Sequence, residues 1–195
     1  MSLVPAFEIG LWNAWILTLY IPLHPLIMML VDKLVGTGDI FKKMETPTFN
    51  KTENIMNIFS NFVLLFGLFI YSIFLPLQLG TAWFYVGLAL SVLGVVAWTI
   101  AIVNIADIQL GKPWNKGLYR YSRHPMTLAG YWILIGAGIA SASGIFLLFS
   151  SVYIILSVIP TVAEERFCLE KFGTAYREYM DKTPRWIGIP KSEKN

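Results

Sequence analysis

Long uncharged stretches dominate the hydrophobic pattern of this chain. Residues 9–31, 54–106 and 125–163 contain no Asp, Glu, Lys or Arg. A helix needs roughly 20 apolar residues to cross the hydrocarbon core of a bilayer. The second stretch is long enough for two helices joined by a turn at residues 76–81, and the third for a hairpin broken at residues 141–144. The pattern therefore predicts five spans, over residues 10–33, 55–77, 82–107, 125–141 and 144–167.

Composition favours a membrane protein over a soluble one. Of the 195 residues, 56% are hydrophobic and only 14% are charged, which is too apolar for an ordinary soluble domain of this length. The alternative is a soluble helical protein with a large buried core. We predict an all-α integral membrane protein, with five transmembrane helices and an amphipathic C-terminal helix. Residues 1–195 form one membrane domain, in which residues 1–81 hold two spans and residues 82–195 hold three.

The basic residues predict the orientation of these spans. All 15 Lys and Arg fall within residues 33–51, within residues 112–123 or after residue 165. With five spans, these segments share one side of the membrane, which the positive-inside rule makes cytoplasmic. We therefore expect the N-terminus outside, and the C-terminal helix on the cytoplasmic side. No basic residue precedes the first apolar stretch, so we expect no cleaved signal peptide.

The sequence also narrows the kinds of site the protein can hold. Cys168 is the only cysteine, and His24 and His124 are the only histidines. These residues cannot build a disulfide framework, a cysteine-based metal site or a multi-histidine metal site. The net charge of +3 follows from the basic loops on one side. We therefore expect neither a metal nor a nucleic-acid partner.

A basic and aromatic cluster lies between two apolar stretches, at residues 117–125, Gly-Leu-Tyr-Arg-Tyr-Ser-Arg-His-Pro. It ends at His124, where the fourth predicted span begins, and Pro125 suits the first position of a helix. One interpretation is a juxtamembrane loop that contacts anionic headgroups. The other is a functional site, because an ionisable side chain at membrane depth needs a partner and often serves function.

Two acids, Glu164 and Glu165, end the last apolar stretch. On a helix with 3.6 residues per turn, one face continues from Glu165 through Leu169, Phe172, Tyr176 and Tyr179. Glu170, Lys171, Arg177 and Glu178 fall on the opposite face. The pattern predicts an amphipathic helix, which Gly173 could bend, with Glu165 at the top of its buried stripe. A buried acid needs a cationic partner; the candidates are Arg120, Arg123, a protonated His124 or a cationic ligand.

Three other polar residues in the apolar stretches carry weaker signals. His24 lies between two prolines on the first span, and we interpret it as a structural residue at a kink. Asn104 and Asp107 lie one turn apart near the inner end of the third span. They either cap that helix or face the same pocket as His124.

Three segments of the chain together resemble the isoprenylcysteine carboxyl methyltransferase family. They are residues 117–125, the run Glu-Glu-Arg-Phe-Cys-Leu-Glu-Lys-Phe-Gly-Thr-Ala-Tyr-Arg-Glu-Tyr at 164–179, and Pro184-Arg185. The similarity is strongest to its short prokaryotic and archaeal members, and it covers about half of the chain. It implies an integral membrane methyltransferase that uses S-adenosylmethionine, releases S-adenosylhomocysteine and methylates the carboxylate of a prenylcysteine-like lipid.

The resemblance also implies roles for individual residues. Glu164 or Glu165 would meet the polar end of the cofactor. Apart from the resemblance, the chemistry of arginine suits Arg120 or Arg123 to hold the acceptor carboxylate bidentately. The remaining residues of the cofactor site would be Asn104, Leu118, Tyr119, His124, Pro125, Met126 and Thr127.

This sequence departs from the family in three places. Residues 111–114 match a cofactor-contacting segment in position but not in residue type. Thr127 replaces the Tyr of many relatives, and Pro160 stands where eukaryotic enzymes have a substrate-binding Arg. The natural acceptor therefore stays open, with a phospholipid amine or a small thiol as alternatives. Two other classes of protein compete with this interpretation: an NADPH-dependent membrane reductase of the sterol type, and a non-catalytic membrane scaffold or small transporter.

Overall fold

The computed structural model describes residues 8–35, 40–45, 47–108 and 114–190. Every regular element among them is a helix. In chain order they are α1 (Trp15–Thr18), α2 (Tyr20–Val35), α3 (Ile40–Lys43), α4 (Lys51–Ile58), the π-helix η1 (Phe59–Leu65), α5 (Phe66–Ser72), α6 (Ala82–Ala106), the 3₁₀ helix η2 (Gly117–Arg120), α7 (Pro125–Ala140), α8 (Gly144–Leu156), α9 (Val158–Phe172) and α10 (Thr174–Lys182).

Four helical segments among the described residues are long and apolar enough to cross a bilayer. They are Trp15–Val35, Lys51–Ser72, Ala82–Ala106 and Gly144–Phe172. The predicted turn and the predicted hairpin break are confirmed, because α6 begins after the first and α7 ends at the second. The fourth predicted span corresponds to α7, whose 16 residues extend only about 24 Å. The integral membrane fold is therefore supported, whereas a count of five spans stays a prediction.

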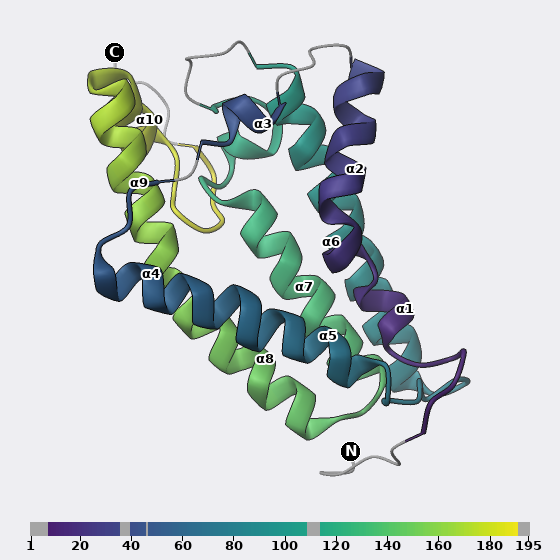
Figure 1. Ribbon diagram of the computed structural model, residues 1–195. Coiled ribbons are helices and arrows are strands. Elements are labelled where there is room, and N and C mark those ends of the chain that lie inside the picture. The colour runs from purple at the N-terminus through teal and green to yellow at the C-terminus, as the bar shows by residue number, and fades with distance from the viewer. Residues whose placement is uncertain (1–7, 36–39, 46, 109–113, 191–195) are drawn as a thin grey trace.

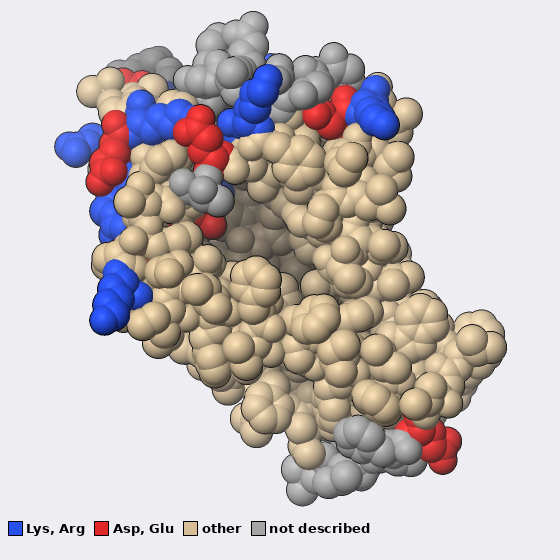
Figure 2. Space-filling model, viewed as in Figure 1, with Lys and Arg blue, Asp and Glu red and all other residues tan. Residues whose placement is uncertain are grey.

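Charged residues gather at one end of the bundle. Helices α3 and α10 lie at that end, and the turn between α7 and α8 lies at the opposite end (Figure 1). On the face shown in Figure 2, most Lys, Arg, Asp and Glu side chains lie near α3 and α10, and the flank below them is almost entirely uncharged. Large apolar side chains on the flanks are exposed, including Leu34, Phe62 and Ile155. This surface is suited to lipid, while the side of the membrane that each end faces stays a prediction.

Close contact between α6 and α7 forms the centre of the bundle. A Cβ atom added to Gly87 would collide with the backbone of Ala140, and one added to Gly136 would collide with Ser91. Small residues allow such close backbone approach, which is the usual basis of helix association in lipid. The contact fixes the position of α7, whose first residues carry the site described below.

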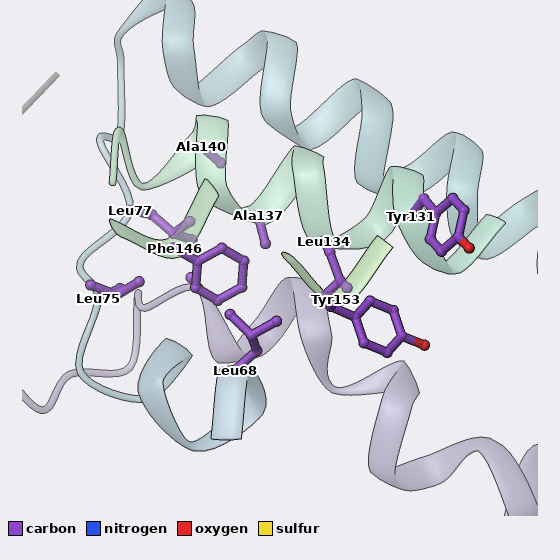
Figure 3. Packing of buried hydrophobic residues seen from close by; sticks show 10 residues of the cluster. Leu68, Leu75, Leu77, Tyr131, Leu134, Ala137, Ala140, Phe146 and Tyr153 are labelled. Atoms are coloured by element: carbon purple, nitrogen blue, oxygen red, sulfur yellow. The ribbon is translucent and has the colours of Figure 1, made fainter. Parts of the chain in front are cut away.

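Two clusters of buried side chains fix the outer helices to this pair. The first joins α5, α7 and α8 and includes Leu68, Leu134 and Phe146 (Figure 3). The second joins α2, α6 and η2, and includes Ile102 and Tyr119. Because Tyr119 belongs to the second cluster, the predicted loop is fixed to the core of the bundle by a buried aromatic side chain.

The predicted amphipathic stripe forms two helices. Helix α9 ends at Phe172, and α10 begins at Thr174, after Gly173 has adopted φ 55° and ψ −125°. This left-handed φ favours glycine, so Gly173 makes the bend that its sequence position suggested. Tyr176 and Tyr179 are buried, and the stripe is confirmed on both sides of the bend.

Candidate functional site

Asn104 shapes the loop that carries the site. Gly117 has a φ of 55°, and a Cβ atom there would collide with the Asn104 side chain. The Asn104 Oδ1 atom accepts a hydrogen bond of 2.9 Å from the backbone N–H of Leu118. Asn104 therefore sets the start of η2 and, through it, the position of Tyr119. Asp107, which we expected either to cap α6 or to face the pocket, is the C-cap residue of α6 and forms an exposed ion pair with Lys116.

The C-terminal segment folds back over this loop. The backbone N–H of Arg123 donates to Pro184 O at 3.1 Å, and that of Gly188 donates to Tyr121 O at 3.0 Å. The hydroxyl of Tyr179, on α10, donates to Tyr119 O at 2.7 Å. Residues 109–113 of the predicted loop lie outside the described residues, so these contacts concern its second half. The contacts bring residues 119–124 and 184–188 into one layer at the charged end of the bundle.

Glu165 lies at the centre of a buried cluster of charges. Its side chain is 4% exposed. Arg185 donates two hydrogen bonds to it, from Nε to Oε1 at 3.0 Å and from Nη2 to Oε2 at 2.6 Å. Bidentate pairing of this kind is the strongest form of carboxylate recognition by arginine. His124 Nε2 lies 3.1 Å from Oε1, and Arg123 Nε also lies 3.1 Å from it. The prediction that Glu165 needs a cationic partner is confirmed.

Glu164 and Glu165 differ in their surroundings. The side chain of Glu164 is 49% exposed, and its Oε2 atom lies 3.5 Å from His124 Nδ1. His124 is therefore placed between the two carboxylates, one on each ring nitrogen. Burial alone would lower its pKa, but the hydrogen bonds to Glu164 and Glu165 and the charges of both acids together raise the pKa above its usual value. The two carboxylates therefore favour the charged form of the imidazole, against the effect of burial.

A cavity of about 260 Å³ lies between this cluster and the charged end of the bundle. We call it the outer cavity. Its walls combine aromatic rings with charged groups, from Lys43, Met44, Glu45, Pro47, Trp114, Tyr119, Arg123, His124, Glu164, Phe167, Cys168, Lys171, Phe172, Tyr176 and Tyr179. Burial raises the pKa of Tyr119 well above its usual range, so this wall offers a neutral phenol.

A second cavity of about 320 Å³, the inner cavity, lies on the other side of His124, between the apolar helices. Its lining combines α2, η1, α6, α7 and α8, and consists of Ile21, His24, Met44, Asn61, Leu65, Trp98, Trp114, Tyr119, Arg123, His124, Met126, Thr127, Gly130, Leu134, Tyr153 and Glu164. Figure 2 shows a hollow in the uncharged flank between α2 and the α4–α5 segment, which carry part of this lining. The inner cavity therefore opens sideways, toward the surface suited to lipid.

The two cavities share one wall. Six residues line both of them: Met44, Trp114, Tyr119, Arg123, His124 and Glu164. The Nε atom of Arg123 is buried and has no hydrogen-bond partner among the described residues, because its ion pair with Glu165 lacks hydrogen-bond geometry. A group held in one cavity can thus approach a group held in the other across His124 and Arg123.

The structure brings most of the predicted site residues together at these cavities. Tyr119, Arg123, His124 and Glu164 lie in the shared wall, and Met126 and Thr127 line the inner cavity. Five others contribute to neither lining. Glu165 lies behind the wall, Arg120 is exposed, Leu118 packs in the core, Pro125 begins α7 and Asn104 holds the loop.

Arg185 and His24 were not assigned to the site from the sequence. The resemblance included Pro184-Arg185 but gave Arg185 no role, because a pair separated by 20 residues leaves no periodic signal on one helix. The fold-back of the chain after α10 creates the Arg185–Glu165 pair. His24 lies on α2, which runs on through Pro25, and it also lines the inner cavity.

Comparison with known proteins gives one family. No curated protein and no solved structure matches the chain. The sequence model of the phospholipid methyltransferase family matches residues 75–175, slightly more than half of the chain. This range includes five of the six residues of the shared wall, all except Met44. The chain belongs to the phospholipid methyltransferase family, the family of membrane methyltransferases similar to isoprenylcysteine carboxyl methyltransferase.

Proposed function

We propose that this protein transfers a methyl group from S-adenosylmethionine, bound in the outer cavity, to a lipid-like acceptor bound in the inner cavity. The observation that carries the proposal is the shared wall of the two cavities, with Arg123, His124 and Glu164 in it. A membrane methyltransferase must bring a water-soluble donor next to a lipid-soluble acceptor. One cavity at the charged end and another that opens on the apolar flank suit these two molecules.

The lining of the outer cavity fits the cofactor. S-adenosylmethionine supplies a methyl group on a cationic sulfonium and carries an adenine ring and a zwitterionic amino-acid tail. Aromatic faces attract such a cation, and the lining offers Tyr119, Tyr176 and Phe167. The tail requires both signs of charge, which Glu164 and Lys171 provide in the same lining. The volume of about 260 Å³ lies just below the range of roughly 300–1,000 Å³ typical of small-molecule pockets.

The two glutamates have different roles in this proposal. Glu165 is occupied by Arg185, His124 and Arg123, so we assign it to positioning these groups. Glu164 lines both cavities, and its only ion pair among the described residues is the 3.5 Å contact with His124. Glu164 is therefore the acid we assign to the cofactor.

The acceptor that we favour is the carboxylate of a prenylcysteine-like lipid. Such a carboxylate is ionised at neutral pH, so methylation needs no general base. Catalysis then depends on orienting the carboxylate toward the methyl group and excluding water. Arg123 lines both cavities and is suited to hold this anion, whereas Arg120 is exposed. We further propose that the charged end faces the cytoplasm, where the cofactor is made.

Calorimetric titration of the purified protein in detergent tests the cofactor assignment. We expect S-adenosylhomocysteine to bind and NADPH not to bind. Binding of NADPH alone would favour a membrane reductase, and binding of neither ligand would favour a non-catalytic scaffold.

Transfer of a labelled methyl group tests the acceptor assignment. The protein in liposomes is supplied with methyl-labelled S-adenosylmethionine and either an S-farnesylated thiol acid or phosphatidylethanolamine. We expect label in the farnesylated acid. Label in phosphatidylethanolamine alone would replace carboxyl methylation with amine methylation, while leaving the two-cavity arrangement intact.

A further inference from the structure

The part of the inner cavity's wall that α2 and α6 form contains two buried nitrogens without partners. They are His24 Nδ1 on α2 and Trp98 Nε1 on α6, and neither has a hydrogen-bond partner among the described residues. Both side chains line the inner cavity. Their rings stack, with centroids 4.7 Å apart and an interplanar angle of 29°. Two unsatisfied polar atoms thus lie on adjacent side chains in the wall of the inner cavity, which also holds the uncharged polar side chains of Asn61 and Thr127.

An unsatisfied buried polar group is costly. Each one carries a desolvation penalty, and proteins pair most of them. Stacking on Trp98 requires only an aromatic ring, which phenylalanine would supply without leaving a nitrogen unpaired. A structural role at a proline kink therefore does not account for a histidine at position 24. A polar group that enters with the acceptor would satisfy both nitrogens.

The chemistry of the two nitrogens selects the kind of group. The indole Nε1–H of Trp98 only donates, whereas the Nδ1 atom of a neutral histidine donates or accepts according to its tautomer. The partner must therefore offer a hydrogen-bond acceptor, and an uncharged oxygen is best suited to an apolar wall. The carbonyl oxygen of an amide or of an ester meets both conditions.

The location adds a second argument. The family match begins at residue 75, so His24 lies outside the matched region, as do Asn61 and Leu65 of η1, which line the same cavity. Five of the six shared-wall residues come from the matched region, as does Trp98, whereas Met44 of the shared wall and the lining residues of the first two apolar helical segments do not. Segments that are not part of the common family sequence are suitable places for features that select one acceptor.

We infer that His24 and Trp98 form a subsite that binds a carbonyl oxygen of the lipid acceptor, while Arg123 and His124 lie next to its methyl-accepting group. This inference rests on the proposed function and adds a specificity determinant to it. The carbonyl has two possible sources: the amide of a lipidated cysteine and the ester of a glycerolipid. The experiment therefore uses one pair of probes for each source.

The first pair differs in an acetamido group, which carries the carbonyl, and the second pair differs in the ester carbonyls alone. The first pair is N-acetyl-S-farnesylcysteine and S-farnesyl-3-thiopropionic acid, which lacks the amide. The second pair is diacyl phosphatidylethanolamine and its dialkyl-ether analogue, which lacks the ester carbonyls. Binding is measured as thermal stabilisation of the detergent-purified protein, and methyl transfer is measured as kcat/KM with labelled S-adenosylmethionine. We expect the carbonyl-containing member of one pair to be preferred by roughly two- to tenfold, the value of one or two net hydrogen bonds.

The variants His24→Phe and Trp98→Phe keep an aromatic ring and remove the nitrogen. We expect each to abolish the preference by weakening only the carbonyl-containing probe, and to leave S-adenosylhomocysteine binding unchanged. His24→Asn, whose amide lies near the place of Nδ1, should restore part of the preference. Tyr20→Phe is the matched control, because Tyr20 packs on Trp98 at 4.4 Å but its hydroxyl faces Thr99.

Equal preference in the wild type and in both phenylalanine variants would overturn the inference, and so would the absence of any preference in the wild type. Failure of the proposed function gives a different result, namely no binding of S-adenosylhomocysteine and no methyl transfer. The binding measurement reports the carbonyl preference even then, so the two failures are distinguishable.

Discussion

The two histidines of this chain both line the inner cavity and have opposite surroundings. His124 lies between two carboxylates, with Glu165 at 3.1 Å and Glu164 at 3.5 Å. His24 stacks on Trp98, and its Nδ1 atom has no partner among the described residues. The same type of side chain thus belongs to a charged network at position 124 and to a cavity wall with unsatisfied nitrogens at position 24.

This difference indicates a division of tasks between the two regions. The region of His124 is built in advance, because its charges are already paired with one another and fixed by the loop and by the C-terminal segment. Such preorganisation suits the place where a charged donor and an anion must be aligned. The region of His24 is incomplete without a further polar group, which suits the recognition of a variable substrate.

Loss of the Glu165 charge should have the largest effect, and only on the region of His124. Glu165→Gln leaves Arg123, His124 and Arg185 around a neutral amide, and breaking a buried ion pair costs about 3–5 kcal/mol. We expect a decrease of that order in the free energy of unfolding, and S-adenosylhomocysteine binding weaker by at least about tenfold. Denaturant unfolding and calorimetry measure the two effects.

Glu170→Gln is the matched control, because Glu170 lies on the same helix but is exposed. It should change neither quantity appreciably. His24→Ala should also leave S-adenosylhomocysteine binding unchanged. If Glu165→Gln bound S-adenosylhomocysteine as tightly as the wild type, the Glu165 cluster would have no part in the cofactor site.

Replacement of Arg185 should have a smaller effect, because its side chain is 35% exposed. Arg185→Lys keeps the charge but loses one of the two hydrogen bonds to Glu165, and lysine cannot reproduce the planar fork of arginine. We expect a loss of about 1 kcal/mol in unfolding free energy and a several-fold weaker affinity for S-adenosylhomocysteine. Arg177→Lys, on the exposed face of α10, is the control, and equal behaviour of the two variants would show that only the charge matters.

The loss of one proton from His124 should have the smallest effect, which is on the stability of the fold. Its pKa is raised above the usual value near 6.5, so the charged ring stabilises the fold fully below that value, and this contribution is lost as pH rises through the raised pKa. We expect the apparent melting temperature of the wild type to fall over that range of pH. His124→Asn should flatten this part of the profile of melting temperature against pH, whereas His24→Asn should retain it. An identical profile for His124→Asn and the wild type would assign the effect to another group.

Sequence reasoning located the helices and most of the shared wall. Uncharged stretches and turn residues determine where the helices begin and end, and helical spacing put Glu165 on the buried face with Tyr176 and Tyr179. The Arg185–Glu165 pair could not be found this way, because it depends on the chain reversing after α10. The unpaired nitrogens of His24 and Trp98 also gave no signal, because they result from the packing of α2 against α6.

Some predicted roles changed for a similar reason. Asn104 was expected to contact the cofactor, yet its side chain supports the turn at Gly117, whose left-handed φ was not evident from the sequence. Arg120 and Arg123 were equivalent in the sequence, three residues apart. The 3₁₀ turn of η2 separates them, with Arg120 exposed and Arg123 in the shared wall.

Filling the inner cavity tests the division between the two cavities most directly. Gly130 lines the inner cavity, and a Cβ atom added there meets no atom within 4 Å. Gly130→Leu should therefore leave S-adenosylhomocysteine affinity unchanged in calorimetry and abolish methyl transfer to the lipid acceptor. Gly67→Leu, which also meets no atom within 4 Å but lies on the exposed flank, should retain both. Loss of S-adenosylhomocysteine binding in Gly130→Leu, or unchanged methyl transfer, would contradict the assignment of cofactor and acceptor to separate cavities.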